Sequence, residues 1–255
     1  MEPAFLRAAV LPPPRDGEPP REGHPWGLPA IAALQGDGLA LDPAVTFLVG
    51  ENGSGKSTLV EAIAVAAGMN PEGGSSNFGF ATREEPIPLG DAIRLTRGVR
   101  RPRTDFFLRA ESLFNAGSYL DRMTREDPTG RAALASYGGI SLHEQSHGES
   151  FLAVILNRFG PDGLYVLDEP EAALSAQNCL TLIRRMHELV QDGSQFLIAT
   201  HSPLLLAYPG AAIYELSPDG AARVDYDDAA PVRLTRAFLR APERFLGELL
   251  DADRD

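Results

Sequence analysis

Residues 50–57, which read GENGSGKS, have the residue types and the spacing of a loop that binds phosphate groups. Glycine backbones can turn successive N–H groups toward the β- and γ-phosphates of a nucleotide, and a helix that begins at the loop adds the positive end of its dipole. Lys56 is the only lysine of the chain, and its compact ammonium can lie along two phosphates. The alternative is a chance glycine-rich turn before a core helix. The predicted nucleotide-binding residues here are Gly50, Glu51, Asn52, Gly53, Ser54, Gly55, Lys56, Ser57 and Thr58.

Two carboxylates follow an apolar run at residues 164–167. Such a run predicts a buried strand, and open α/β sheets bind ligands at the C-terminal ends of their strands, where Asp168 and Glu169 emerge. Neighbouring side chains of a strand point in different directions, so Asp168 can reach a Mg²⁺ ion held by the hydroxyl of Ser57. Glu169 can then face the γ-phosphate and polarise a water molecule for in-line attack. The alternative is a pair of solvated acids at a strand end.

A histidine follows a second apolar run, at residues 195–199. This run also predicts a strand, so His201 lies at the same edge of the sheet as the two acids and can donate to the γ-phosphate. Single histidines usually have structural or surface roles, and we interpret His24, His143 and His187 in that way.

Residues 145–150 read QSHGES and precede an apolar run at 151–156, a pattern that predicts a helix opened by a hydroxyl and a glycine. The N-terminus of a helix offers backbone donors to an anion, and that anion can be the γ-phosphate of a nucleotide bound to another subunit. The alternative is an ordinary helix cap.

The remaining pattern predicts the elements that position these groups. Strands alternate with helices, which is typical of an α/β fold with a largely parallel sheet. The predicted strands are 5–10, 45–49, 106–108, 163–167, 195–200 and 212–216, and the predicted helices are 57–67, 111–125, 132–137, 177–191 and 243–252. An irregular loop rich in Pro and Gly is predicted at 11–27, a second loop at 71–88, and a helical subdomain inserted at about 105–150.

Composition and charge limit the class of protein. With 255 residues and a net charge of −12, the chain is predicted to be soluble and to form one domain, and its charge disfavours binding to nucleic acid or anionic membranes by charge alone. Its one cysteine, Cys179, cannot form an internal disulfide, which favours the cytoplasm. No run is long and apolar enough to cross a bilayer, and the N-terminus lacks the pattern of a signal peptide, so we expect no membrane insertion.

Together, in their order along the chain, these segments resemble the motifs of the ATP-binding cassette (ABC) ATPases. The resemblance spans about residues 45–203: residues 50–57 resemble Walker A, 146–149 the signature motif, 164–169 Walker B, 173–175 the D-loop, and His201 the switch histidine. It implies a P-loop NTPase core with a mainly parallel sheet, ABC-type antiparallel β additions and a helical subdomain.

The resemblance also implies a head-to-tail homodimer in which each ATP lies between Walker A of one subunit and the signature motif of the other. In that arrangement Ser57 and Asp168 hold Mg²⁺, Glu169 activates water and His201 senses the γ-phosphate. The signature residues implied to complete the site across the dimer are Ser146, Gly148 and Glu149.

Three features depart from the pattern of transporter subunits. The signature segment 145–149 reads QSHGE rather than LSGGQ, and Ser175 stands where many D-loops have aspartate. No glutamine occurs between Lys56 and Gln145, so the residue that links nucleotide to a transmembrane partner is missing or replaced. Residues 107–112 and 141–150 instead resemble a small family of stand-alone bacterial ABC-type ATPases.

Two further features have open interpretations. Trp26 lies upstream of the phosphate loop at about the distance at which transporter-type members place an aromatic ring on adenine; the alternative is an aromatic that packs on the surface. A basic run can bind nucleic acid, meet an acidic partner, pair within the chain or form a solvated face, and we favour pairing within the chain or with a partner. The run consists of Arg94, Arg97, Arg100, Arg101 and Arg103.

The sequence therefore predicts an Mg²⁺-dependent ATPase that hydrolyses ATP to ADP and phosphate. Our leading hypothesis for its task is a cytosolic mechanical or regulatory role, in DNA maintenance or stress defence. The first alternative is the ATP-binding subunit of an ABC membrane transporter. A second alternative, a nucleotide-gated binding module with little turnover, is disfavoured by the presence of Glu169 and His201.

Overall fold

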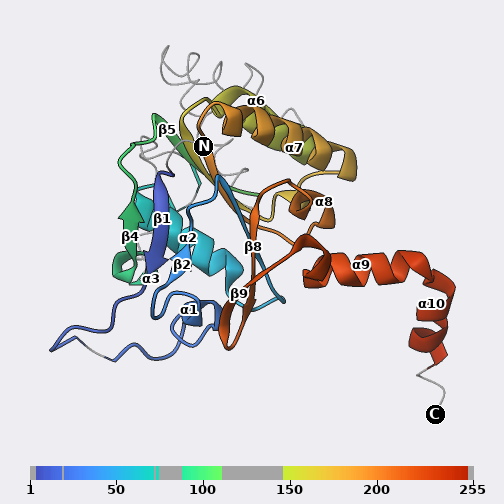
Figure 1. Cartoon of the computed structure of the whole chain (residues 1–255), viewed down its shortest axis with the longest axis horizontal. Coiled ribbons are helices and arrows are strands. Elements are labelled where there is room, and N and C mark those ends of the chain that lie inside the picture. The colour runs from blue at the N-terminus through green and yellow to red at the C-terminus, as the bar shows by residue number, and fades with distance from the viewer. Residues whose placement is uncertain (1–3, 19, 72, 75–87, 111–145, 252–255) are drawn as a thin grey trace.

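A computed structural model describes residues 4–18, 20–71, 73–74, 88–110 and 146–251. Within these residues the centre of the molecule is a six-stranded sheet with the order β5-β6-β7-β3-β8-β9 (Figure 1). Neighbouring strands from β5 to β8 are parallel, and β9 pairs antiparallel with β8. Its strands are β3 (Val45–Val49), β5 (Thr104–Arg109), β6 (Gly163–Asp168), β7 (Gln195–Ala199), β8 (Ala212–Ser217) and β9 (Gly220–Val224). The predicted α/β class with a mainly parallel sheet is confirmed.

Helices cover both faces of this sheet. On one face Phe47 of β3 packs in a core that includes Phe151 of α6 and Leu182 of α7, while on the other Leu48 packs with Leu59 of α2. Every residue of β3, β6 and β7 is buried, which explains why these strands occur in the sequence as apolar runs. The α-helices are α1 (Pro29–Ala32), α2 (Lys56–Ala67), α3 (Pro88–Ala92), α6 (His147–Arg158), α7 (Ala176–Gln191), α8 (Pro203–Leu206), α9 (Ala230–Arg240) and α10 (Pro242–Asp251).

A smaller antiparallel sheet has the order β2-β1-β4 and includes the first strand of the chain. Its strands are β1 (Leu6–Val10), β2 (Leu39–Ala40) and β4 (Arg94–Arg97). The buried side chain of Gln195 joins this sheet to β7: its oxygen accepts the N–H groups of Phe5 at 3.0 Å and Leu6 at 2.9 Å, and its nitrogen donates to the carbonyls of Leu6 and Leu41. This amide adds buried hydrogen bonds between the two sheets to the apolar core that they share.

Arginines of the basic run pair within the chain, which was one of the two interpretations favoured from the sequence. Arg97 donates to the carbonyls of Ala66 and Ala67 at the end of α2, at 3.3 and 3.2 Å. Arg100 and Arg103 both form ion pairs with Asp162, which directly precedes β6. Part of the run also forms strand β4, which was not predicted because three of its four residues are exposed.

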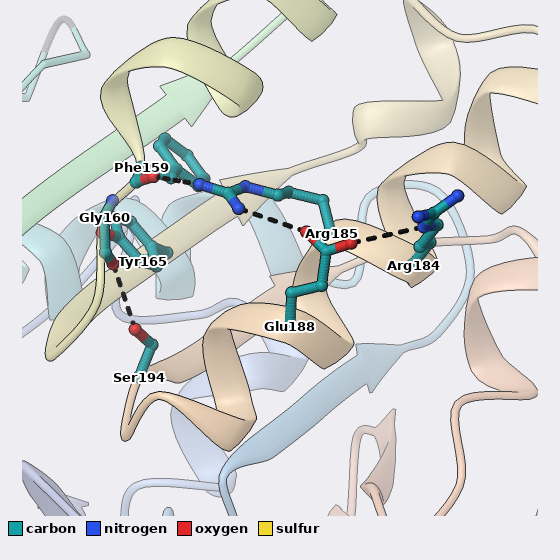
Figure 2. A network of polar contacts seen from close by, with 7 residues as sticks. All are labelled: Phe159, Gly160, Tyr165, Arg184, Arg185, Glu188 and Ser194. Atoms are coloured by element: carbon teal, nitrogen blue, oxygen red, sulfur yellow. Dashed lines mark hydrogen bonds and ion pairs between the residues drawn. The ribbon is translucent and has the colours of Figure 1, made fainter.

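The turn between α6 and β6 is fixed against α7 (Figure 2). Arg185 of α7 donates to the carbonyl of Phe159 at 2.7 Å and pairs with Glu188 at 3.2 Å. The hydroxyl of Tyr165 donates to the carbonyl of Gly160 and accepts its N–H, both at 2.7 Å, while the ring stacks on Phe159 with centroids 4.0 Å apart. Burial raises the pKa of Tyr165 to about 12. These contacts anchor the C-terminal end of the helix whose first turn carries the signature-like segment.

The chain ends in α9 and α10, which project from the body of the molecule (Figure 1). Both expose leucines, including Leu239 at 70% and Leu250 at 69%. In the described ranges, no helix has the length and apolar character needed to cross a membrane.

Some predicted elements lie outside the described residues, namely the helices at 111–125 and 132–137 and most of the loop at 71–88. The described residues of segment 11–27 contain no helix or strand. The predicted C-terminal helix is α10, whereas α9 and β9 were not predicted. Pro231 and the three arginines of α9 obscured its apolar face in the sequence.

Candidate functional site

The phosphate-binding loop joins β3 to α2 in a conformation that requires glycine. Gly53 and Gly55 have φ angles of +81° and +91°, a region that residues with a β-carbon rarely adopt. A β-carbon on Gly55 would also lie 3.0 Å from that of Leu28 and 3.1 Å from that of Ala30. The loop is therefore fixed both by its backbone and by the packing of Leu28 and Ala30 at the start of α1.

Lys56 is the first residue of α2 and is 4% exposed. Its Nζ atom donates to the carbonyl oxygens of Gly50 at 2.9 Å and Glu51 at 3.0 Å, so the side chain curls back over the loop. Burial lowers the pKa of Lys56, and the nearby carboxylates of Glu169 and Asp168 act against that change. The ammonium is thus placed inside the loop with acids facing it.

Asp168 ends β6 and provides a carboxylate beside this lysine. Burial raises the pKa of Asp168, whereas the guanidinium of Arg109 and the hydroxyl of Ser57 act to lower it. Within the described residues, its Oδ1 atom is buried and has no hydrogen-bond partner. A hydroxyl and a carboxylate oxygen are ligands that Mg²⁺ accepts, commonly together with phosphate oxygens. Ser57 and Asp168 therefore fit the predicted metal site.

Arg109, at the end of β5, holds the other oxygen of this carboxylate. Its Nε atom donates to Asp168 Oδ2 at 2.9 Å, and its Nη2 atom donates to Glu61 of α2 at 3.0 Å. Burial acts to lower the pKa of Arg109, but the two carboxylates outweigh it and raise the pKa. The guanidinium therefore stays charged and ties β5, β6 and α2 together directly beneath the predicted metal site.

Glu169 has a strained backbone and lies close to His201. Its φ and ψ are +47° and +56°, a left-handed conformation that is uncommon for a residue with a side chain and that is found at functional sites. Its N–H donates to the carbonyl of Ala199 at 2.9 Å, which orients the turn after β6. Glu169 Oε1 is 3.7 Å from Nε2 of His201, and the two side chains are 40% and 35% exposed.

Three buried polar atoms around the loop have no hydrogen-bond partner in the part of the chain that the structure describes: Ser54 Oγ, Asp168 Oδ1 and His201 Nε2. They come from the loop after β3, the end of β6 and the segment after β7, and these strands are neighbours in the sheet. Buried polar groups nearly always find a partner in a folded protein. The arrangement therefore predicts a polar ligand that contacts all three strand ends.

The signature-like segment forms a capping box on α6. Ser146 Oγ accepts the N–H of Glu149 at 3.4 Å, while Glu149 Oε2 accepts the N–H and the hydroxyl of Ser146 at 2.9 and 2.7 Å. The hydrogen bond from the Ser146 hydroxyl is the main cause of a lowered pKa of Glu149. Both residues are exposed, and their hydrogen bonds in the described region stay within the cap.

Gly148 contacts the segment that corresponds to the D-loop. A β-carbon on Gly148 would lie 3.0 Å from the carbonyl oxygen of Ala173, so only glycine permits this approach without a shift. Ser175, two residues further on, caps α7 by accepting the N–H of Asn178 at 3.2 Å. The first turns of α6 and α7 therefore meet at this point.

A cavity of about 1060 Å³ opens beside the phosphate loop. Its lining includes residues 50–54, His201, Pro29 and one side of α9. Trp26 is not part of the lining; it packs against the core beside α2, and the guanidinium of Arg21 lies 5.2 Å from its ring centroid. Stacking of Trp26 on adenine therefore stays a prediction from the sequence.

Comparison with known families decides which kind of protein this site belongs to. The family described as "AAA domain, putative AbiEii toxin, Type IV TA system" matches residues 45–111 and 136–207, more than half of the chain. The chain belongs to the ABC-type P-loop ATPases. We use the motif names of this family as labels, Walker A for residues 50–57 and Walker B for residues 164–169, and the role of His201 as the switch histidine stays a prediction.

Relatives of this ABC-type ATPase include two proteins described as import ATP-binding proteins. It is 29% identical over 195 residues to the ribose import ATP-binding protein RbsA 1 of Rhizobium meliloti (strain 1021), a match that covers 71% of this chain and 38% of that protein. It is 31% identical over 205 residues to the hemin import ATP-binding protein HmuV of Burkholderia pseudomallei (strain 1710b), covering 69% of this chain and 75% of that protein. The chain thus spans well under half of the ribose protein.

Among solved structures, the ATPase is similar to cbiO1 from Clostridium perfringens, part of the ABC transporter complex cbiONQ. That match covers 98% of this chain and 100% of the other, with 15% sequence identity and a TM-score of 0.47.

Three residues of the site were missed in the sequence: Arg109, Glu61 and Glu171. Arg109 directly follows the predicted strand 106–108, just as Asp168 follows its strand, so the same rule could have found it. Glu61 carries no comparable signal, because an acid inside a helix is usually solvated. Glu171 holds the backbone at His201, a contact that depends on how the turn after β6 folds.

Proposed function

We propose that this ABC-type ATPase hydrolyses ATP to ADP and phosphate with Mg²⁺, and that it does so with ATP held between two copies of the chain. The proposal is supported above all by three buried atoms, Ser54 Oγ, Asp168 Oδ1 and His201 Nε2, which have no hydrogen-bond partner within the described residues and lie at the strand ends beside Walker A. A cation, a hydroxyl, a carboxylate oxygen and an imidazole nitrogen at one sheet edge match the needs of a magnesium triphosphate.

Each residue has a distinct role in this reaction. Lys56 and the N–H groups of Walker A hold the β- and γ-phosphates in place. Glu169 orients the attacking water and accepts its proton as the new P–O bond forms and the bond to ADP breaks. His201 donates from Nε2 to a γ-phosphate oxygen. Ser57 and Asp168 would hold Mg²⁺, which would neutralise charge on the phosphate oxygens.

The second copy is needed because the signature residues serve a different nucleotide. Ser146 and Glu149 are exposed, and the first turn of α6 offers backbone N–H groups to an anion. In a head-to-tail homodimer this turn closes on the γ-phosphate at Walker A of the partner subunit. ATP then favours the closed dimer, because the γ-phosphate supplies contacts that exist only there, and hydrolysis releases them.

For the task that hydrolysis drives, we propose a cytoplasmic role in DNA maintenance or stress defence. The absence of glutamine between Lys56 and Gln145 supports a partner other than a permease. The named relatives favour a second candidate, the ATP-binding subunit of a membrane importer, since both carry that description.

Steady-state ATP hydrolysis by the purified chain tests this proposal. The assay is run with and without duplex DNA, at low and at physiological salt, with Lys56→Ala as the background and Arg7→Ala as a control that removes an exposed cation. Hydrolysis above the Lys56→Ala background supports the ATPase, and its absence contradicts it. Stimulation by DNA that survives physiological salt favours DNA maintenance; membrane proteins captured by Glu169→Gln with ATP favour the importer.

A further inference from the structure

Glu171 is a carboxylate beside the active site that the roles above do not use. It lies in the 3-10 helix η2 (Pro170–Ala172), two residues after Glu169. Its Oε2 atom accepts the hydroxyl hydrogen of Thr200 at 2.8 Å, and its Oε1 atom accepts the backbone N–H of His201. Both oxygens therefore bind the two residues that follow β7.

These bonds determine the backbone on both sides of His201. Thr200 is fully buried, and its hydroxyl oxygen also accepts the N–H of Ser202 at 3.0 Å, just before α8 begins. The hydroxyl hydrogen of Thr200 is thus directed to Glu171. Removal of Glu171 leaves the N–H of His201 and the hydroxyl of Thr200 without this acceptor in a confined place, where lost hydrogen bonds carry a large penalty.

The neighbouring acid does not hold the imidazole in the same way. Glu169 Oε1 and His201 Nε2 are 3.7 Å apart, which is beyond the range of a hydrogen bond. Within the described residues the ring nitrogen is buried without a hydrogen-bond partner, so the position of the ring follows from the backbone that Glu171 binds. The same short segment also reaches the signature helix, because the carbonyl of Ala173 packs against Gly148.

We propose that Glu171 is the positioning residue of His201, holding the imidazole where it can donate to the γ-phosphate. The inference rests on the proposed ATPase function and adds a residue that the motifs do not assign. In this role Glu171 acts through His201 and not on the water or the metal ion. Hydrolysis then depends on the acceptor atom and the length of the side chain at position 171, and not on its negative charge.

This distinction makes the conservative variants informative. In Glu171→Gln the amide oxygen can still accept the N–H of His201, which is the contact that positions the imidazole. The Thr200 hydroxyl hydrogen loses its acceptor, but the amide nitrogen can donate to the second lone pair of that oxygen instead. Glu171→Asp keeps the charge but is one methylene shorter and cannot reach both groups. A positioning role therefore predicts that Glu171→Gln preserves ATP hydrolysis and that Glu171→Asp and Glu171→Ala do not. If Glu171 were instead a general base or a charge partner of Lys56, Glu171→Asp would preserve hydrolysis and Glu171→Gln would not.

The first measurement is kcat and KM for ATP in these variants. We expect Glu171→Ala and Glu171→Asp to lower kcat by about 10- to 100-fold, as loss of a supporting residue typically does, with KM within about threefold of wild type. Glu171→Gln should stay within about threefold of wild type in kcat. The control Glu188→Ala removes a carboxylate that pairs with Arg184 and Arg185 on α7, and it should leave kcat unchanged.

A double-mutant cycle tests whether Glu171 acts through His201. In a His201→Ala background, Glu171→Ala should lower kcat by less than about twofold further, because the residue it positions is gone. Multiplicative losses in the double variant would overturn the proposal, as would a Glu171→Gln enzyme as slow as Glu171→Ala. If the alanine variant does not fold, Glu171→Asp supplies the same comparison.

A spectroscopic readout separates this inference from the proposed function. The Cε1–Hε1 NMR signal of His201 is identified by its loss in His201→Ala and is recorded without nucleotide. We expect Glu171→Ala to shift this signal and to leave that of His24 in place. If the wild-type chain hydrolyses ATP no faster than Lys56→Ala, the proposed function is contradicted. The NMR shift of His201 in Glu171→Ala still tests whether Glu171 positions the imidazole. An unmoved His201 signal in Glu171→Ala overturns the inference.

Discussion

Replacing Arg109 by methionine should destabilise the fold far more than the same replacement at Arg7. In both cases the arginine Nε atom lies 2.9 Å from an aspartate oxygen, which makes the two sites a matched pair. The partner of Arg109, Asp168, has a side chain that is 5% exposed, whereas the partner of Arg7, Asp42, has one that is 56% exposed. Arg109 also pairs with Glu61, whose side chain is 12% exposed.

The size of the effect follows from this burial. Removing one partner of a buried ion pair costs about 3–5 kcal/mol, chiefly because a charge stays behind without its counter-ion. Arg109 itself is 20% exposed, so water offsets part of the loss and we expect the lower end of that range. A loss of about 3 kcal/mol corresponds to more than a hundredfold in the unfolding equilibrium. At Arg7 water screens the pair, and the change should be too small to resolve.

Urea unfolding followed by circular dichroism measures both effects in the absence of nucleotide and metal. The free energies of unfolding of Arg109→Met, Arg7→Met and wild type are compared at neutral pH. If the two variants lose the same stability, the ion pairs around Asp168 do not hold β5, β6 and α2 together, and the reasoning is refuted.

Three further predictions concern packing, pH and the join between the sheets. Gly148→Ala should lower the free energy of unfolding by at most about 2 kcal/mol, because crowding of its β-carbon at 3.0 Å from the carbonyl of Ala173 is partly offset by the roughly 0.5–1 kcal/mol that alanine gains over glycine in a helix; an unfolding midpoint above that of wild type contradicts the crowding. Because burial raises the pKa of Tyr165 from 10.0 to about 12, the stability linked to its protonation is present below pH 10 and lost as pH rises toward 12. An absorbance titration should show a phenol ionisation near pH 12 that is lost in Tyr165→Phe. Gln195→Leu should cost at least about 2 kcal/mol in urea unfolding, because two buried backbone N–H groups lose their acceptor; a neutral effect contradicts that role.

The strands that carry the site were predictable because burial on both faces leaves a continuous apolar run. Val45–Val49 is the same in prediction and structure, and β6 extends the predicted strand 163–167 by Asp168 alone. Since the C-terminal ends of parallel strands meet at one edge of a sheet, the grouping of Lys56, Asp168 and His201 followed from the order of the motifs.

Contacts that depend on the fold of turns were not predictable. Glu171 binds the backbone of His201 because η2 directs its side chain across the end of β7, and no periodic pattern reports such a direction. Strand β4 was not predicted because only Leu95 among its four residues is shielded from solvent, so its sequence is typical of a charged surface segment. Helix α9 was hidden because Arg233, Arg236 and Arg240 interrupt its apolar positions.

The central claim, that ATP is held between two copies of the chain, is tested most directly by the mass of Glu169→Gln in solution. Size-exclusion chromatography with light scattering is run without nucleotide, with Mg-ATP and with Mg-ADP, and the Lys56→Ala/Glu169→Gln double variant serves as the control. We expect the mass to double with Mg-ATP alone, and the double variant to stay at the mass of one chain. A Glu169→Gln protein that binds Mg-ATP and remains a monomer would contradict the claim.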